Sequence, residues 1–272
     1  MRKKSQMAIF FLVGLVVLAS FGIIYLATSN VRKASPSTAT GSEGDSLQAY
    51  VQSCLDLTSK NAVWLAGRYG GYVYPTYPPV MQTDYGIVVY DYQYGENMKM
   101  LPSIEDIEQQ ISIYVASEIP NCINFRQFRE QGYSVSAGFP IAKTTIAQNN
   151  VIVDLDYPIT LSKGAEQLKQ ENFKSTVNVH LRSVYDNVSN IISAVGDADS
   201  EGDFALIGEV SKDLQNQPKF SINFLFRIPE SDMKVDYKFM PDHISTLWAI
   251  HDDKTKPEYL FIFATKHRQV ID

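Results

Sequence analysis

Apolar residues form one long uncharged block near the start of the chain and short periodic groups after it. Residues 7–28 contain no charged side chain, and a helix of this length spans about 33 Å, enough for a bilayer core of about 30 Å. We therefore predict a transmembrane helix over 7–28, preceded by a basic end at 1–6. Residues 29–46 are small and polar and predict a flexible linker. The remainder, 47–272, is expected to form the folded domain.

Three segments of this domain have apolar residues at helical spacing. The first helix is predicted from Leu47 to about Gly67, capped by Asp45 or Ser46. The second follows Ser103, whose spacing to Asp106 matches a capping box, and is predicted to end at Pro120. The third is predicted over 181–195, closed by Gly196, and a further short helix over 203–214.

β-branched and aromatic runs predict strands between and after these helices. Asn149-Asn150 separates two such runs and predicts a hairpin turn, and Val151 to Tyr157 alternate apolar and polar positions. The predicted strands are 85–94, 133–137, 141–148, 151–161, 173–180, 219–228, 233–240, 244–251 and 259–265. Mixed helices and antiparallel hairpins predict the α+β class.

The charges beside the apolar block predict its orientation. Arg2, Lys3 and Lys4 precede it, and only Arg32 and Lys33 follow before the chain turns acidic. This bias favours a single-pass protein of the cytoplasmic membrane with its N-terminus inside and residues 47–272 outside. A cleaved secretory signal is the alternative, although its apolar core is usually about 7–15 residues and is followed by a small-residue cleavage site.

The overall net charge of −6 conceals an asymmetry. Residues 1–33 contain five Lys or Arg and no acidic residue, so the rest of the chain has 19 basic and 30 acidic residues. An acidic domain repels nucleic acid, and nucleic-acid binding is therefore disfavoured. The lipid bilayer, through 7–28, is the partner that the sequence predicts directly.

The two cysteines, Cys54 and Cys122, both follow the apolar block. An even number of cysteines in an extracytoplasmic domain suggests a disulfide, with two buried free thiols as the alternative. Each cysteine is close to a predicted helix, so the bridge would join two helices.

Candidate catalytic and metal-binding groups are sparse. His251-Asp252-Asp253 with His243 has metal-ligand residue types but reads better as a hairpin loop. Asp154 and Asp156 share a strand face, which paired-carboxylate chemistry could use but which a solvated sheet face explains. The acidic residues of 197–203 lack the spacing of an EF-hand. No catalytic residue, metal or cofactor is therefore predicted.

Two surface features are better candidates. Tyrosines are concentrated between residues 69 and 94, and their flat, amphipathic rings suit protein or glycan surfaces, with ordinary strand packing as the alternative. The candidate binding residues are Tyr72, Tyr74, Tyr77, Tyr90 and Tyr92. Asn187-Val188-Ser189 is a glycosylation sequon, and Asn187 is expected to be exposed opposite the apolar face of its helix.

Lys3-Lys4-Ser5-Gln6 followed by apolar residues resembles the prepilin-type signal of archaeal type IV pilin-like proteins. That resemblance implies cleavage between Ser5 and Gln6. The early acidic residue that many pilins carry in this helix is missing, and the linker interrupts the helix.

Together with Tyr50 to Leu55, Gly70-Gly71-Tyr72 and a helix followed by Cys122, the N-terminus resembles uncharacterised membrane-anchored proteins of small-genome archaea. The resemblance covers about half of the chain and implies a surface location, paired cysteines and no transferable catalytic residue. We expect a non-enzymatic surface protein with an adhesive, envelope or pilus-related role. A processed pilin-like subunit and an anchored hydrolase of envelope polymers are the alternatives.

Overall fold

A computed structural model describes residues 43–75, 79–83, 86–93, 98–201, 224–227, 233–240 and 245–266. The chain divides into two compact units, Met1–Asp45 and Ser46–Asp272, and the described helices and strands belong to the second unit apart from the first turn of α2. Among the described residues, no helix is both long and apolar enough to cross a membrane. The predicted segment 7–28, Ser5, Gln6 and the predicted helix 203–214 lie outside the described residues.

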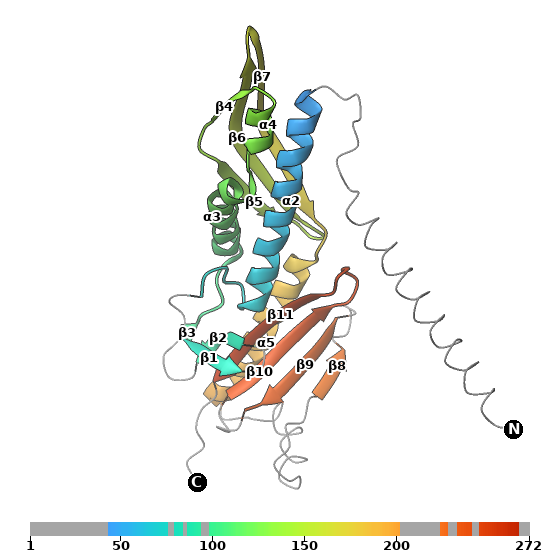
Figure 1. The fold of residues 1–272 in the computed structure, drawn as a ribbon. Helices are drawn as coiled ribbons and strands as arrows, with labels where there is room; N and C mark the ends of the chain where they lie inside the picture. The colour runs from blue at the N-terminus through green and yellow to red at the C-terminus, as the bar shows by residue number, and fades with distance from the viewer. Residues whose placement is uncertain are drawn as a thin grey trace, which may run out of the picture. The chain divides into compact units, whose positions relative to one another are not determined.

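The second unit is α+β, and its strands form two sheets (Figure 1). The larger sheet has seven strands in the order β1-β2-β11-β10-β9-β8, with β3 paired to β2. Its pairs are antiparallel except β2 with β11. The strands are β1 (Val80–Thr83), β2 (Gly86–Gln93), β3 (Met98–Lys99), β8 (Phe224–Arg227), β9 (Lys234–Phe239), β10 (Ser245–Asp252) and β11 (Tyr259–Lys266).

The smaller sheet is entirely antiparallel and is built around a long central strand. Its strands are β4 (Ser134–Ala137), β5 (Ile141–Ile146), β6 (Val151–Lys163) and β7 (Glu166–Val177). β7 pairs along β6, whereas β4 and β5 pair with separate parts of it. The predicted Asn149-Asn150 hairpin and the alternating burial of β6 are both confirmed.

Helix α2 (Glu43–Arg68) runs along both sheets (Figure 1). Toward its N-terminal end, Gln52 Nε2 donates a hydrogen bond to the Lys174 carbonyl of β7. Toward its C-terminal end, the fully buried Tyr259 of β11 donates its hydroxyl to the Val63 carbonyl at 3.2 Å. One main core, centred on α2, therefore joins helices and sheets in this unit.

The remaining helices are α3 (Ile104–Cys122), α4 (Arg126–Glu130) and α5 (Leu181–Glu201). The capping box at the start of α3 is confirmed, because Ser103 Oγ accepts from the Asp106 amide and the Asp106 carboxylate accepts from the Ser103 amide. α3 packs on β5, where Ser112 Oγ donates to Thr144 Oγ1 at 2.9 Å.

Three predicted helix ends differ from those of the structure. α2 starts at Glu43 rather than Leu47, since Asp and Ser are tolerated in a first helical turn as well as at its cap. α3 continues through Pro120 to Cys122, whose covalent bond holds the last turn. α5 continues through Gly196, where a Cβ would lie 3.2 Å from the Tyr92 ring. Gly196 thus permits close packing instead of ending the helix.

Candidate functional site

A disulfide joins the two long N-terminal helices of the domain. Cys54 in α2 and Cys122 at the end of α3 are bonded, with Cα atoms 5.8 Å apart. The predicted bridge is therefore confirmed, and the alternative of two free thiols is excluded. The bridge closes a loop across a sequence separation of 68 residues, so it removes much of the conformational freedom of the unfolded chain.

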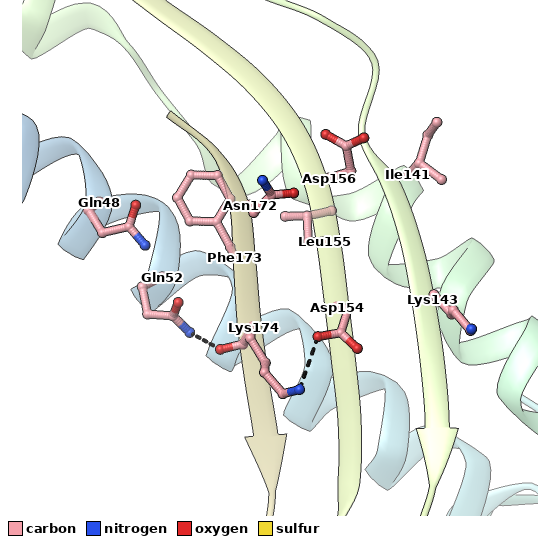
Figure 2. A pocket seen from close by; sticks show the side chains of 10 residues that line it. All are labelled: Gln48, Gln52, Ile141, Lys143, Asp154, Leu155, Asp156, Asn172, Phe173 and Lys174. Carbon is pink, nitrogen blue, oxygen red and sulfur yellow. Dashed lines mark hydrogen bonds and ion pairs between the residues drawn. The ribbon is translucent and has the colours of Figure 1, made fainter. Parts of the chain in front are cut away.

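An open depression of about 510 Å³ lies where α2 meets the smaller sheet (Figure 2). Its lining is mixed rather than apolar: amides, two lysines and two aspartates surround a few apolar side chains. The lining residues are Gln48, Gln52, Ile141, Lys143, Asp154, Leu155, Asp156, Asn172, Phe173 and Lys174. With equal numbers of acidic and basic groups, the depression has no net charge and presents both donors and acceptors.

The two aspartates that the sequence offered as a carboxylate pair lie on the exposed face of β6. Asp154 forms a 3.3 Å ion pair with Lys174, and both side chains are more than half exposed. Asp156 is exposed beside it, opposite Ile141 of β5. Solvated carboxylates of this kind lack the desolvation that makes one member of a hydrolytic pair a general acid.

Two apolar side chains project into solvent here: Ile141, which lines the depression, and Phe139, two residues before it in the chain. Phe139, in the connection between β4 and β5, is 91% exposed, and Ile141 is 67% exposed. The connection is held in place because the Gly138 amide donates to the Pro158 carbonyl at 2.8 Å. A Cβ on Gly138 would lie 2.8 Å from the Pro158 ring, so only glycine permits this close crossing. Phe139 is therefore presented to solvent on an anchored turn.

The tyrosine-rich segment does not form one surface. Tyr92 is 8% exposed and belongs to the main core, so its assignment to a binding surface is corrected. Tyr90 packs on the other side of the sheet, against a small apolar cluster, with its hydroxyl 3.0 Å from Ser245 Oγ. Tyr92 is buried and Tyr90 partly buried, because packing on the two faces of the sheet covers the apolar area of their rings.

The other tyrosines lie near α3. Tyr72 is half-buried and donates its hydroxyl to the Met100 carbonyl. Tyr74 is 45% exposed, and its ring centroid is 5.9 Å from that of Tyr114. Tyr77 lies outside the described residues. Of the four candidates that are described, Tyr74 alone is exposed.

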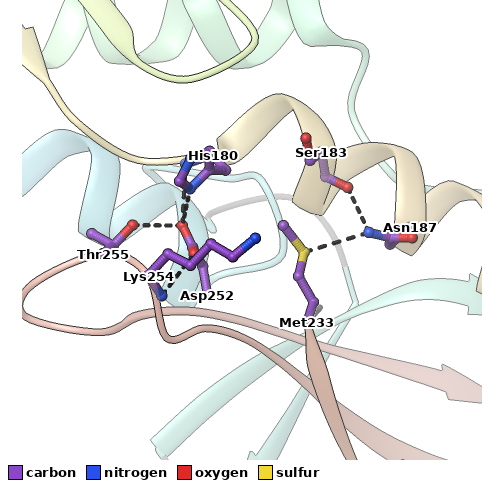
Figure 3. A network of polar contacts seen from close by, with 7 residues as sticks. All are labelled: His180, Ser183, Asn187, Met233, Asp252, Lys254 and Thr255. Carbon is purple, nitrogen blue, oxygen red and sulfur yellow. Dashed lines mark hydrogen bonds and ion pairs between the residues drawn. The ribbon is translucent and has the colours of Figure 1, made fainter. Parts of the chain in front are cut away.

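Asn187 is not freely exposed, contrary to the helical-face prediction (Figure 3). Its Nδ2 donates to the Ser183 carbonyl at 2.9 Å and approaches the Met233 sulfur at 3.4 Å. Met233 precedes β9, so a distant segment covers a helix face that sequence spacing places in solvent. The amide nitrogen that would carry a glycan is already engaged within the fold.

The polar residues at the β10–β11 turn form a structural network (Figure 3). The buried Asp252 carboxylate accepts hydrogen bonds from the His180 amide at 3.2 Å and from the Thr255 hydroxyl, and His180 Nδ1 lies 2.8 Å from it. Burial acts to raise the pKa of Asp252, but hydrogen bonds from Thr255 and His180 outweigh burial and lower it. His251 is not part of this network; its Nδ1 lies 2.9 Å from Glu258 Oε1.

Asp252 and His251 bind different partners, so the residues of the possible metal site do not converge. Within the described part of the chain, no group of three or more His, Cys, Asp or Glu residues is placed to hold a metal ion. His243 is outside that part. The network around Asp252 instead ties the loop before α5 to the β10–β11 turn.

We predict that Asp252→Asn destabilises the domain at neutral pH by about 2 kcal/mol, because a carboxylate with charge-assisted hydrogen bonds is lost. The pKa of Asp252 is lowered by folding, so its contribution is present above the unfolded pKa of about 4 and is lost as pH falls through the folded value. Urea denaturation at pH 7, 5 and 3 should show the gap between wild type and variant closing on the acid side.

Asp253→Asn is the matched control for this series, because the neighbouring carboxylate is exposed and forms a surface ion pair with Lys234 at 3.0 Å. Its effect should stay below about 1 kcal/mol. If Asp252→Asn lowered the free energy of unfolding by the same amount at all three pH values, the ionised Asp252 carboxylate would not be what stabilises the network.

Two notable residues were not selected by sequence reasoning. Phe139 stands beside Pro140 in a loop, and a large aromatic residue next to a turn-forming residue was the available signal. Asp91 interrupts the β-rich run of 85–94 and proves to be fully buried in β2. A single acidic residue among strand-forming residues was the signal for that position.

Searches of protein-family models, curated proteins and solved structures find no match for this chain. The resemblance of the N-terminal half to membrane-anchored archaeal proteins therefore stays a prediction. Function is inferred from the geometry of the described residues together with the sequence.

Proposed function

We propose that this protein is a non-enzymatic, single-pass membrane protein whose disulfide-containing domain lies outside the cell and contacts other envelope components. The Cys54–Cys122 disulfide is the observation that carries the proposal. Disulfides persist in oxidising compartments and are rare in the cytosol. The apolar block 7–28, with more basic residues before it than after it, supports an anchor oriented with the domain outside.

The contact role is supported by Phe139 and Ile141, which we name the apolar projection. Phe139 is 91% exposed, so its side chain adds little to the packing of the domain. An exposed apolar side chain on an anchored turn also lowers solubility. Aromatic anchors beside a mixed polar depression are typical of protein interfaces, where a few such residues supply most of the binding energy. We propose another envelope protein as the partner.

Phe139→Ser should weaken binding of the full-length protein to an isolated envelope fraction of the producing cells by roughly tenfold or more. Its free energy of unfolding should change by less than about 0.5 kcal/mol, since the side chain is solvated in the folded state. Co-sedimentation of detergent-solubilised protein with the envelope fraction measures the first quantity, and urea denaturation the second.

Leu57→Ser provides the control, because Leu57 is a 57% exposed apolar residue of α2 that does not line the depression. It should leave co-sedimentation unchanged. Equal binding by wild type and Phe139→Ser would show that the apolar projection does not contact the partner. Loss of binding after glycosidase but not protease treatment of the envelope would identify a glycan partner instead.

A further inference from the structure

Asp91 combines complete burial with the absence of a hydrogen-bonding partner. Its side chain is 0% exposed, and neither carboxyl oxygen has a partner among the described residues. The carboxyl packs directly against the turn after α2: a Cβ on Gly70, which has φ +62°, would lie 2.8 Å from Asp91 Oδ2. An ionised carboxylate in such a place is strongly disfavoured, whereas a neutral carboxyl is tolerated.

The backbone shows why the side chain points inward. Tyr90 pairs with Ala264 of β11 and Tyr92 pairs with Thr265, so Asp91 is the extra residue of a β-bulge. Because of this extra residue, Tyr90 and Tyr92 point to opposite faces of the sheet. Tyr90 packs against the small apolar cluster, and Tyr92 lies in the main core. Bulges re-aim side chains and are enriched at functional positions.

The turn above the carboxyl is tied to the same strand. Tyr72 donates its hydroxyl to the Met100 carbonyl, and the Met100 amide donates to the Asp91 carbonyl at 2.7 Å. Burial, with smaller contributions from the charges of Asp91 and Asp106, raises the pKa of Tyr72 to about 12. Movement of Asp91 would therefore disturb the turn, β2 and the segment after β3 together.

Charged groups on the neighbouring elements do not compensate Asp91. The charged residues on the neighbouring elements are Arg68 of α2, Glu105 and Asp106 of α3, and Lys266 of β11. The Arg68 guanidinium lies near Gly86. Burial alone accounts for a pKa of Asp91 well above its usual range. Among the described side chains, none forms a hydrogen bond with the Asp91 carboxyl that would favour its ionised form.

We propose that Asp91 is a pH-sensitive latch: its neutral carboxyl seats the β2 bulge under the Gly70–Tyr72 turn, and its ionisation releases β1, β2 and β3 from β11. These three strands are at one end of the larger sheet, and β2 holds to β11 through three parallel residue pairs near the bulge. Release would uncover the edge of β11, which is then free to pair with a strand of a partner.

The sign of the pH dependence follows from the direction of the shift. Folding raises the pKa of Asp91, so the stabilisation is fully present below the unfolded pKa of about 4 and is lost as pH rises toward the folded value. Within that window, each unit of pH should increase the fraction of open β2 by about tenfold.

Amide hydrogen exchange of the full-length protein in detergent micelles tests the latch. After correction for intrinsic exchange rates, protection of the amides of 88–93 should fall by about tenfold per pH unit over part of the range from pH 4 to 8. In Asp91→Asn, whose side chain cannot ionise, protection should be independent of pH and higher than in wild type at pH 8. Asp156→Asn, an exposed aspartate of β6, should match wild type.

A second measurement keeps the test decisive if Asp91→Asn does not fold. The carboxyl carbon of Asp91 in wild type should titrate well above the usual range of an aspartate by nuclear magnetic resonance, because burial raises its pKa. Titration of Asp91 near pH 4, or the same pH dependence of β2 protection in wild type and Asp91→Asn, would overturn the latch.

Discussion

Replacing either Cys54 or Cys122 with alanine should lower the free energy of unfolding by about 4 kcal/mol. The bridge spans a sequence separation of 68 residues, and the chain-entropy model assigns a stabilisation of this size to a loop of that length. Urea denaturation of the oxidised proteins measures the loss. The expected size is a large part of the total stability of a typical domain.

The design of this experiment separates the bridge from the packing of the two sulfurs. The double variant should be about as unstable as each single variant, because either substitution removes the same bond. Reductant should destabilise wild type by a similar amount and leave the double variant unchanged. Losses that add between the two single variants would show that side-chain packing, rather than the bond, stabilises this region.

Gly67→Ala should destabilise the domain by about 2 kcal/mol, although alanine is the better helix former by about 1 kcal/mol. A Cβ at this position of α2 would lie 2.5 Å from the Leu260 carbonyl oxygen and 2.7 Å from the Tyr259 ring. Because the nearest atom belongs to the backbone of β11, the helix and the sheet would have to move apart. Thermal and urea denaturation both measure the effect.

Gly196→Ala is the matched comparison, since it is another helical glycine that packs on a sheet. Its nearest neighbour would be the Tyr92 ring at 3.2 Å, a side chain that can adjust, so we expect a change below about 1 kcal/mol. A Gly67→Ala protein that is more stable than wild type would contradict the close contact between α2 and β11.

Features specified by adjacent residues could be predicted from the sequence. The capping box of Ser103 and Asp106 and the Asn149-Asn150 hairpin were predicted correctly, because each depends on side chains a few residues apart. The alternation along β6 also predicted its buried face correctly. The even cysteine count suggested a bridge that the fold confirms.

Features specified by distant segments could not be predicted. β2 pairs in parallel with β11, about 170 residues later, and no local pattern identifies that partner. The same limitation explains Asn187, which Met233 covers, and Tyr92, which the packing of α5 at Gly196 buries. Asp91 could be noticed as an acidic residue in a strand, but its burial depends on a bulge that only the pairing with β11 reveals.

Two buried aspartates, Asp91 and Asp252, are expected to change the stability of the domain with pH in opposite directions. Hydrogen bonds lower the pKa of Asp252, so acid weakens the network at the β10–β11 turn. Burial raises the pKa of Asp91, so rising pH above about 4 weakens the attachment of β2. Maximum stability should therefore lie between these two transitions.

Proteinase digestion of intact cells, followed by mass spectrometry without reduction, tests most directly whether the domain lies outside the membrane. We predict that peptides from 47–272 are released, that those containing Cys54 and Cys122 remain linked, and that residues 1–6 are protected. Release of these peptides only after the membrane is permeabilised, with Cys54 and Cys122 reactive toward a thiol reagent, would contradict the proposed location and with it the proposed function.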